Sequence, residues 1–256
     1  MIQNITHEDG RIRELRLARP PVNALNLDLL RELGLEIERA ARDSSSIVVS
    51  GKPGLFSAGL DVPALLELDR EGLTAVFVEL YRAQRTLAYC PVPVVFALTG
   101  HCPAGGTVLA IHGDYRILAR GEFRIGLNEV QVGLFPGDLI HGAFARLTGG
   151  HAAQLLTRGA LVDPIEALRI GLVDELAEPA EVVARGIAVA REFANLPREA
   201  MLRTRALARG GLLSLFGSPE HASIRESEFG ALGAEMWLVP ETRQLLKKSF
   251  AKKSTG

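Results

Sequence analysis

The chain has 256 residues, of which 47% are hydrophobic and 23% charged, and its formal net charge is −1. This composition is typical of a globular protein with a large core, and the balanced charge gives no reason to expect nucleic acid or an anionic membrane as a partner. The two cysteines, Cys90 and Cys102, lack CxxC spacing and a His/Cys cluster, so neither a disulfide scaffold nor a bound metal is expected.

Hydropathy gives no membrane or secretion signal. The first ten residues are polar, and the sequence contains no run of 18 apolar residues that could span a bilayer. We therefore expect a cytoplasmic protein without a membrane segment.

Strands and helices alternate in the first half of the chain. Period-two alternation after the turn HEDG predicts a hairpin strand over 11–20. Apolar residues at helical spacing predict a helix over 26–44, with Asn26 as its N-cap. The further expected strands cover 45–51, 92–100 and 114–121, and the further expected helices cover 72–90 and 107–113.

Helices dominate the second half of the chain. They are expected over 138–148, 151–158, 164–170, 179–197, 199–208, 221–235 and a last segment that ends near Lys248. The stretch NLPREA (195–200) is the best candidate for a seam, which divides the chain into a core domain over 1–197 and a helical C-terminal region over 198–256. The strand–helix–strand spacing predicts an α/β fold with parallel crossovers, and the similar buried strands favour a spiral of β-β-α turns over a doubly wound sheet.

Small residues interrupt the chain twice, each time before an expected helix, in SAGLD (57–61) and CPAGG (102–106). The first amides of a helix have no internal partner and lie at the positive end of its dipole. If the amides of Leu60 and Gly105 converged, they would form an oxyanion hole. Two ordinary tight turns would explain the same residues, and on the pattern alone that explanation stays open.

Longer segments around these breaks resemble the enoyl-CoA hydratase/isomerase (crotonase) superfamily. The similar segments, in chain order, are PPVNALN (20–26), GKPGLFSAGLD (51–61), GHCPAGG (100–106), DYRIL (114–118) and IGLNEVQVGLFP (125–136). Within the superfamily, the later motifs are most similar to mitochondrial-type Δ3,Δ2-enoyl-CoA isomerases. The resemblance covers about residues 10–180.

The resemblance implies both an architecture and a substrate. It implies a crotonase-like spiral of β-β-α repeats, a helical C-terminal region that closes the acyl site, and a homotrimer or a dimer of trimers. It implies that the amides of Leu60 and Gly105 polarise the thioester carbonyl of an acyl-CoA. It implies no cofactor, since coenzyme A is part of the substrate. The residues that it places near substrate and coenzyme A are Val22, Ala24, Ala58, Gly59, Asp61, Gly106 and Val108.

The carboxylates decide which reaction is expected. Crotonase-type hydratases use two glutamates, and in this chain the first position is Val108 while the second matches Glu129. One carboxylate suffices to move a double bond, because a single base can take a proton from C2 and return it to C4 of a dienolate. An apolar wall at Val108 should exclude water and raise the pKa of Glu129. We therefore expect an enoyl-CoA isomerase of β-oxidation.

Other interpretations stay open at this point. The chain could be an enoyl-CoA hydratase, or a non-catalytic acyl-CoA-binding homologue. Glu129 could be a solvated or salt-bridged glutamate on a loop, paired for instance with Arg124. Asp138 is expected to cap the helix that starts there, with contact to substrate as the alternative.

The remaining conspicuous residues have structural explanations. His112 is expected to be a core histidine with satisfied hydrogen bonds, His141 to lie on a helix surface, Cys102 to be a small buried residue and Trp237 to be a packing residue. FVELYRAQ (77–84) and the stretch up to Trp237 are expected to line or cover the acyl tunnel. A solvated charge run explains the C-terminal lysines, with binding of coenzyme A phosphates as the alternative for Lys247, Lys248, Lys252 and Lys253.

Overall fold

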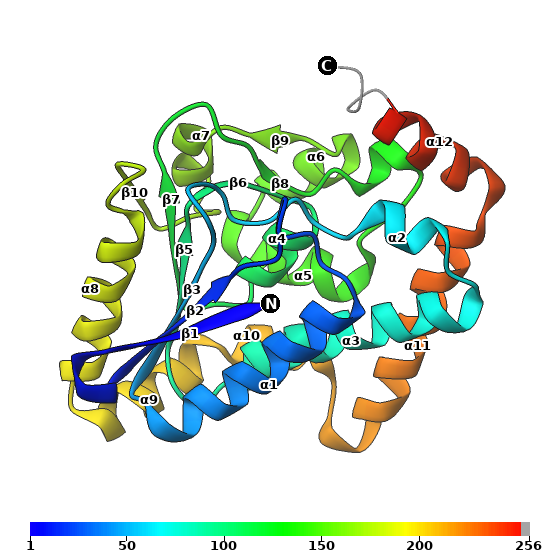
Figure 1. Ribbon diagram of the computed structural model, residues 1–256. Helices are drawn as coiled ribbons and strands as arrows, with labels where there is room; N and C mark the ends of the chain where they lie inside the picture. Colours follow the sequence, from blue (N-terminus) through cyan, green and yellow to red (C-terminus); the bar gives the residue numbers. More distant parts are fainter. Residues whose placement is uncertain (252–256) are drawn as a thin grey trace.

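Two sheets organise the chain in the computed structural model, which describes residues 1–251 (Figure 1). Within those residues, the larger sheet has six strands and the smaller has four. The larger sheet has the order β1 (Ile2–His7), β2 (Ile12–Leu17), β3 (Ser46–Ser50), β5 (Val94–Leu98), β7 (Tyr115–Ala119) and β10 (Glu175–Ala177). The smaller sheet has the order β4 (Gly54–Leu55), β6 (Gly100–Pro103), β8 (Ile125–Gly126) and β9 (Leu161–Val162).

Each turn of the chain adds one strand to each sheet and then a helical segment. β3 and β4 are followed by α2 (Val62–Leu66) and α3 (Arg70–Tyr89), and β5 and β6 by α4 (Gly105–Ala110). β7 and β8 are followed by the 3-10 turn η2 (Glu129–Val132) and α5 (Gly137–Thr148). In the larger sheet, the neighbouring strands β2, β3, β5, β7 and β10 pair in parallel. The predicted α/β spiral of β-β-α turns is confirmed.

The central strands are buried on both faces, which explains their unbroken apolar sequences. Successive residues of β3 face different cores: Val49 packs in the cluster that contains α1 (Leu27–Asp43) and α3, and Val48 in the cluster that contains α8 (Val182–Asn195). Figure 1 shows the large sheet between these helices. At the start of α1, the Asn26 side chain accepts a hydrogen bond from the Leu29 amide at 3.0 Å, which confirms the predicted N-cap.

The second half contains helices at the expected places and short strands that periodicity did not predict. The remaining helices are α6 (His151–Arg158), α7 (Pro164–Arg169), α9 (Arg198–Ala208), α10 (Gly210–Leu213), α11 (Ala222–Leu238) and α12 (Pro240–Ala251). β9 and β10 were missed. The strand predicted over 92–100 is β5, and β6, which begins at its last residue and belongs to the smaller sheet, was missed as well. Strands of two or three residues are too short to show a period.

The chain crosses the predicted seam between α8, which ends at Asn195, and α9, which begins at Arg198. Beyond it, Arg205 and Arg209 bind the buried carboxylate of Asp114, at 2.7 and 2.8 Å. Arg209 also donates to the carbonyl oxygens of Leu87 and Ala88 at the end of α3. The helices after the seam are therefore fastened to the spiral, and the division at residue 197 stays a prediction.

Two glycines allow α11 to lie against α3. A Cβ on Gly233 would lie 2.2 Å from Cγ of Phe77, and one on Gly230 would lie 2.6 Å from a methyl carbon of Val78. None of the helices within residues 1–251 combines the length and hydropathy needed to cross a bilayer.

Gly233→Ala should therefore lower the free energy of unfolding by about 1–3 kcal/mol, because the added methyl group overpacks the contact with Phe77. Gly34→Ala is the matched control: this glycine also lies in a helix, α1, but nothing approaches its Cβ position within 4 Å. The control should be stabilised by up to about 1 kcal/mol through helix propensity. Urea unfolding measures both, and equal stabilities would contradict the close packing.

Candidate active site

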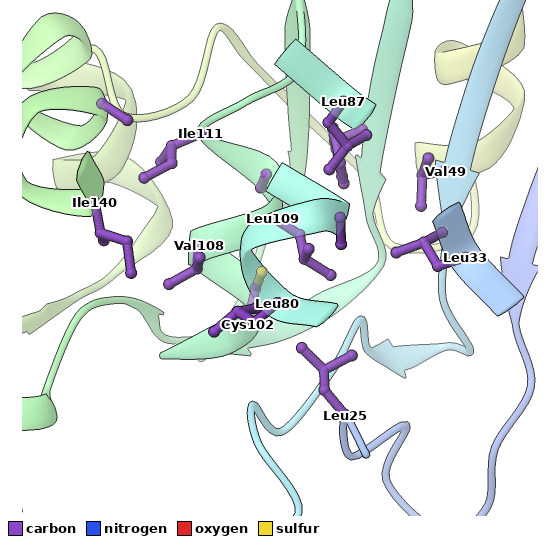
Figure 2. Close-up of a cluster of buried hydrophobic side chains, with 14 of the residues drawn as sticks. Leu25, Leu33, Val49, Leu80, Leu87, Cys102, Val108, Leu109, Ile111 and Ile140 are labelled. Atoms are coloured by element: carbon purple, nitrogen blue, oxygen red, sulfur yellow. The ribbon is translucent and has the colours of Figure 1, made fainter. Parts of the chain in front are cut away.

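A cavity of about 550 Å³ lies where α3, α4, α5, α11 and α12 meet the segments after β4 and β8. Most of its wall is apolar, for instance Phe77, Leu80, Val108 and Phe229. Figure 2 shows Val108 on α4 beside Leu109, Cys102 and Leu80, within the hydrophobic cluster that surrounds this short helix. The cavity combines the concave shape and apolar lining that are typical of small-molecule sites.

The Leu60 amide is held free by a parallel bridge between Leu25 and Leu60. The Leu25 amide donates to the Gly59 carbonyl oxygen at 2.8 Å, and the Asp61 amide donates to the Leu25 carbonyl oxygen at 2.9 Å. Both bonds lie on one side of the strand, so the Leu60 amide between them finds no acceptor within residues 1–251. Gly59 has a φ of 89°, which favours glycine at this turn.

The Gly105 amide is the first of α4, where amides have no intrahelical acceptor. Ala104 before it has a φ of 49°, a strained value for alanine, and donates its own amide to the Gly126 carbonyl oxygen at 2.8 Å. A Cβ on Gly105 would lie only 3.3 Å from the Leu60 nitrogen. The two amides that sequence motifs singled out are therefore neighbours at the cavity wall.

One part of the sequence argument was wrong: Leu60 is not in the first turn of a helix. α2 begins at Val62, and Asp61 is its N-cap, whose side chain accepts from the Ala64 amide at 3.3 Å. The free amide of Leu60 therefore comes from the strand-like bridge, not from a helix end. Asp61 also binds Arg19 at 2.6 Å, and Arg19 donates to the Ala24 carbonyl oxygen at 2.9 Å, so that the turn is tied down.

Glu129 brings a buried carboxylate to the same cavity. Part of the residue is accessible, but its Oε2 is buried and has no hydrogen-bond partner within the described residues. Burial in apolar surroundings raises the pKa of Glu129 to about 7 from an ordinary value of 4.5. The alternative that Glu129 is paired with Arg124 is wrong: the Arg124 guanidinium donates to the Phe123 carbonyl oxygen, and no hydrogen bond or ion pair joins it to Glu129 within residues 1–251.

The position of a second glutamate is apolar, as predicted, because Val108 is buried in the cavity wall. The other carboxylates of the wall within residues 1–251 are Asp138 and Glu228, and both are exposed. Asp138 is not the N-cap residue, because α5 begins at Gly137 after Pro136. Its Oδ1 nevertheless accepts a hydrogen bond from the first-turn amide of Leu139 at 2.9 Å, and its Oδ2 binds Arg225 at 2.9 Å.

Some of the other predicted site residues line the cavity, and the rest lie behind its wall. Ala58 lines the cavity together with Leu60, Gly105, Val108, Glu129 and Asp138. The residues outside the lining are Val22, Ala24, Gly59, Asp61 and Gly106. Among them, Val22 accepts the Ala58 amide at 3.0 Å, and a Cβ on Gly106 would lie 3.1 Å from the Cys102 sulfur. Their proximity to coenzyme A stays a prediction.

Most of the remaining conspicuous residues lie as expected, but His112 and Trp237 differ from the expectation in one respect each. Cys102 is fully buried and His141 is exposed on α5, as expected. His112 is buried and its pKa is lowered to about 3 by burial, but only its Nδ1 is bonded, to the Val108 carbonyl oxygen. Trp237 packs against Phe77 and also lines the cavity. Lys247 and Lys248 are exposed, while Lys252 and Lys253 lie outside the described residues.

Residues of both expected tunnel segments line the cavity, and the wall also contains residues from elsewhere that were not predicted. Arg225, Gln131 and Phe135 belong to the wall. The apolar GLFP run (133–136), which lies outside any predicted helix or strand, was a signal for this wall. A single arginine within a helix, such as Arg225 in α11, gave no signal in the sequence.

The spiral of β-β-α turns, with free amides and a lone buried carboxylate at one cavity, defines an enzyme of the crotonase class. A model of the enoyl-CoA hydratase/isomerase family matches residues 7–209, and the chain belongs to this family.

The similar proteins within the family are named either as enoyl-CoA isomerases or as enoyl-CoA hydratases. The human mitochondrial enoyl-CoA delta isomerase 1 is 31% identical over 223 residues, which cover 82% of this chain and 72% of the relative. A probable enoyl-CoA hydratase of Mycobacterium avium is 34% identical over 218 residues, which cover 82% of this chain and 81% of the relative. The crystal structure of human mitochondrial delta3-delta2-enoyl-CoA isomerase matches with a TM-score of 0.90 at 25% identity, over 100% of this chain and 99% of that one.

Glu129→Gln should stabilise the protein above pH 7, because an ionised carboxylate in this apolar wall opposes folding and a neutral amide does not. The folded-state pKa is raised, so the wild type loses stability as pH rises from 4.5 through 7. The gain at pH 8 should approach about 3 kcal/mol and should vanish below pH 4.5. Denaturant unfolding at both pH values measures it, with the exposed rim carboxylate in Glu228→Gln as control. Equal stability of Glu129→Gln and wild type at pH 8 would contradict the burial.

Proposed function

We propose that this enzyme converts Δ3-enoyl-CoA into trans-Δ2-enoyl-CoA, a double-bond shift of fatty-acid β-oxidation. One observation carries the proposal: the buried carboxylate of Glu129 shares a cavity with the adjacent amides of Leu60 and Gly105. Val108 supports it further, because it replaces the second glutamate that hydration needs.

The first step uses the two amides. The thioester oxygen accepts hydrogen bonds from Leu60 and Gly105, and negative charge that develops on this oxygen is stabilised by about 2.7–4 kcal/mol per donor. The protons on C2 become more acidic as a result. These donors need no reorganisation, because the Leu25 bridge and the start of α4 fix them before substrate arrives.

Glu129 then carries the proton. Its carboxylate takes a proton from C2, and the electron pair of the C2–H bond passes into a dienolate whose charge lies on the thioester oxygen. The protonated Glu129 returns the proton to C4, where the C3–C4 pair forms the new C–H bond while the C2–C3 double bond and the carbonyl form. Atoms and charge balance without a metal or a redox cofactor, and coenzyme A stays attached throughout.

Hydration is the second candidate, because one relative is named a probable enoyl-CoA hydratase. Adding water to C3 requires a base that activates the water while another group protonates C2. Among residues 1–251, the wall carboxylates other than Glu129 are exposed, and Asp138 is held by Arg225. This arrangement favours isomerisation.

Separate incubation with a 3-enoyl-CoA and with crotonyl-CoA tests the choice of reaction. We expect turnover of the first and little formation of the 3-hydroxy product from the second. Rapid hydration of crotonyl-CoA would assign the enzyme to the hydratases, and binding of both thioesters without turnover would leave an acyl-CoA-binding protein.

The proposal also covers the location of the enzyme, its assembly and its contacts with coenzyme A. We propose that it acts on acyl-CoA in the cytoplasm as a homotrimer or a dimer of trimers. We also propose that Val22, Ala24 and Ala58 lie along the coenzyme A. Sedimentation of the full chain tests the assembly, with a monomer as the contradicting result.

Glu129→Gln should lower kcat by roughly 10²–10⁴-fold, because general acid–base catalysis contributes that much. Binding of the substrate thioester should change little, since the substitution keeps the size of the side chain. Steady-state kinetics and calorimetric titration with a saturated acyl-CoA measure the two effects. Unchanged turnover would contradict the role of Glu129.

The pH profile should report the raised pKa of Glu129. The carboxylate must be ionised to take the C2 proton, so kcat/KM should reach a plateau above pH 7 and fall below it. At pH 6 the value should be roughly a tenth of the plateau, since ionisation changes tenfold per pH unit below the pKa. A profile that stays flat down to pH 5 would contradict the burial of the base.

A further inference from the structure

The turn that carries Glu129 is held less firmly by burial than the two amides it faces across the cavity. Glu129 begins the 3-10 turn η2, and all four residues of this turn are partly accessible. Leu60 and Gly105, by contrast, are fixed by the bridge to Leu25 and by the start of α4. The position of the carboxylate therefore depends on hydrogen bonds within η2 and on the elements that pack against it.

The backbone after Glu129 folds back onto its carbonyl oxygen. The Leu134 amide donates to this oxygen at 3.0 Å, and the Gly133 amide donates to the Val130 carbonyl oxygen at 3.3 Å. Gly133 ends η2 with a φ of 79°, in the left-handed region that favours glycine. A group that binds Gly133 from outside the turn would therefore hold the backbone that carries the carboxylate.

Thr242 on α12 is such a group. Its side-chain hydroxyl donates to the Gly133 carbonyl oxygen at 3.2 Å, and the residue is only 3% exposed. The two segments are in close contact, because a Cβ on Gly133 would lie 2.9 Å from Thr242 Oγ1 and 3.5 Å from a methyl carbon of Leu245. Thr242 lies behind the residues that line the cavity, so it acts on the turn and not on a ligand.

α12 also binds the segment that follows the Leu60 amide. Arg243, the residue after Thr242, donates to the carbonyl oxygen of Leu66, the last residue of α2. One short stretch of α12 thus contacts both parts of the site, the turn with the carboxylate and the helix that follows the first amide.

We propose that Thr242 is a positioning residue of this enzyme: its hydrogen bond to Gly133 holds the turn that carries Glu129 and so sets where the base lies relative to the substrate. The inference deepens the proposed function and rests on it in one respect, because that function makes Glu129 the base. Small displacements matter at this level, since a misplacement of about 1 Å can lower a rate by roughly a hundredfold.

Thr242→Val and Thr242→Ser test the proposal as a pair. Valine keeps the shape of threonine but cannot donate, whereas serine keeps the hydroxyl. Thr242→Val should lower kcat for a 3-enoyl-CoA by roughly 10–100-fold. KM should change little, because Leu60 and Gly105 still hold the thioester, and an interaction needed only for the chemical step changes kcat and kcat/KM together. Thr242→Ser should restore most of the lost rate.

Thr148→Val is the matched control. Thr148 is also 3% exposed, and its hydroxyl donates to the Phe144 carbonyl oxygen at 3.0 Å, within α5 and away from the cavity lining. The two valine variants lose the same kind of hydrogen bond at the same burial, so a general loss of stability would affect both. Thr148→Val should keep the wild-type kcat. An equal fall of kcat in both variants would overturn the proposal, as would a serine variant no faster than the valine variant.

Hydrogen exchange separates this inference from the proposed reaction, because it needs no turnover. Deuterium uptake by peptides that span 129–134 is measured by mass spectrometry on the full chain without substrate. Thr242→Val should speed exchange in this segment and Thr148→Val should not. Equal exchange in Thr242→Val and wild type would contradict the hold of Thr242 on the turn.

The two proposals can therefore fail independently. Faster exchange in Thr242→Val, together with a wild type that isomerises no 3-enoyl-CoA, would support the hold of Thr242 on the turn and contradict the proposed reaction. Isomerisation by Thr242→Val at the wild-type kcat would leave the proposed reaction standing and overturn the positioning role.

Discussion

The burial of one ionisable carboxylate in an apolar cavity is the constraint on which the rest of this site depends. Burial of the Glu129 carboxyl away from water raises its pKa to about 7, and its Oε2 has no hydrogen-bond partner within residues 1–251. An ordinary surface glutamate is a weaker base at neutral pH, and water around it would exchange the proton before it could be returned to the substrate. The stability lost by keeping this carboxylate dry is recovered by the large apolar core, in which α4 is surrounded by buried side chains (Figure 2).

The spiral explains how three distant segments meet. β4, β6 and β8 are neighbours in the small sheet, and each comes from a successive turn of the chain. Leu60 follows β4, Gly105 follows β6 and Glu129 follows β8, so the site collects the residues that come at the same stage of three turns. The backbone around them is set by specific contacts: the Leu25 bridge, and the positive φ of Ala104. Two helices beyond residue 197, α11 and α12, then complete the cavity wall.

Sequence reasoning predicted the fold class, the long helices and several residues that the structure brings together at one cavity, because these leave local patterns. Asn26 before an apolar period marks a helix start, and the runs IVV and VVFAL mark strands that are buried on both faces. It failed where tertiary contacts decide. β9 and β10 exist only through their neighbours, and Leu60 owes its free amide to Leu25, which lies 35 positions earlier.

The transfer of deuterium from C2 to C4 tests the central claim most directly, since the claim is that one shielded carboxylate carries the same proton between two carbons. A 3-enoyl-CoA dideuterated at C2 is converted in ordinary water, and the label at C4 of the product is measured by mass spectrometry and NMR at the earliest turnovers. The account predicts that a substantial fraction of the product carries deuterium at C4. Product with hydrogen from water alone at C4, even in the first turnovers, would contradict a proton shuttle that is shielded from solvent.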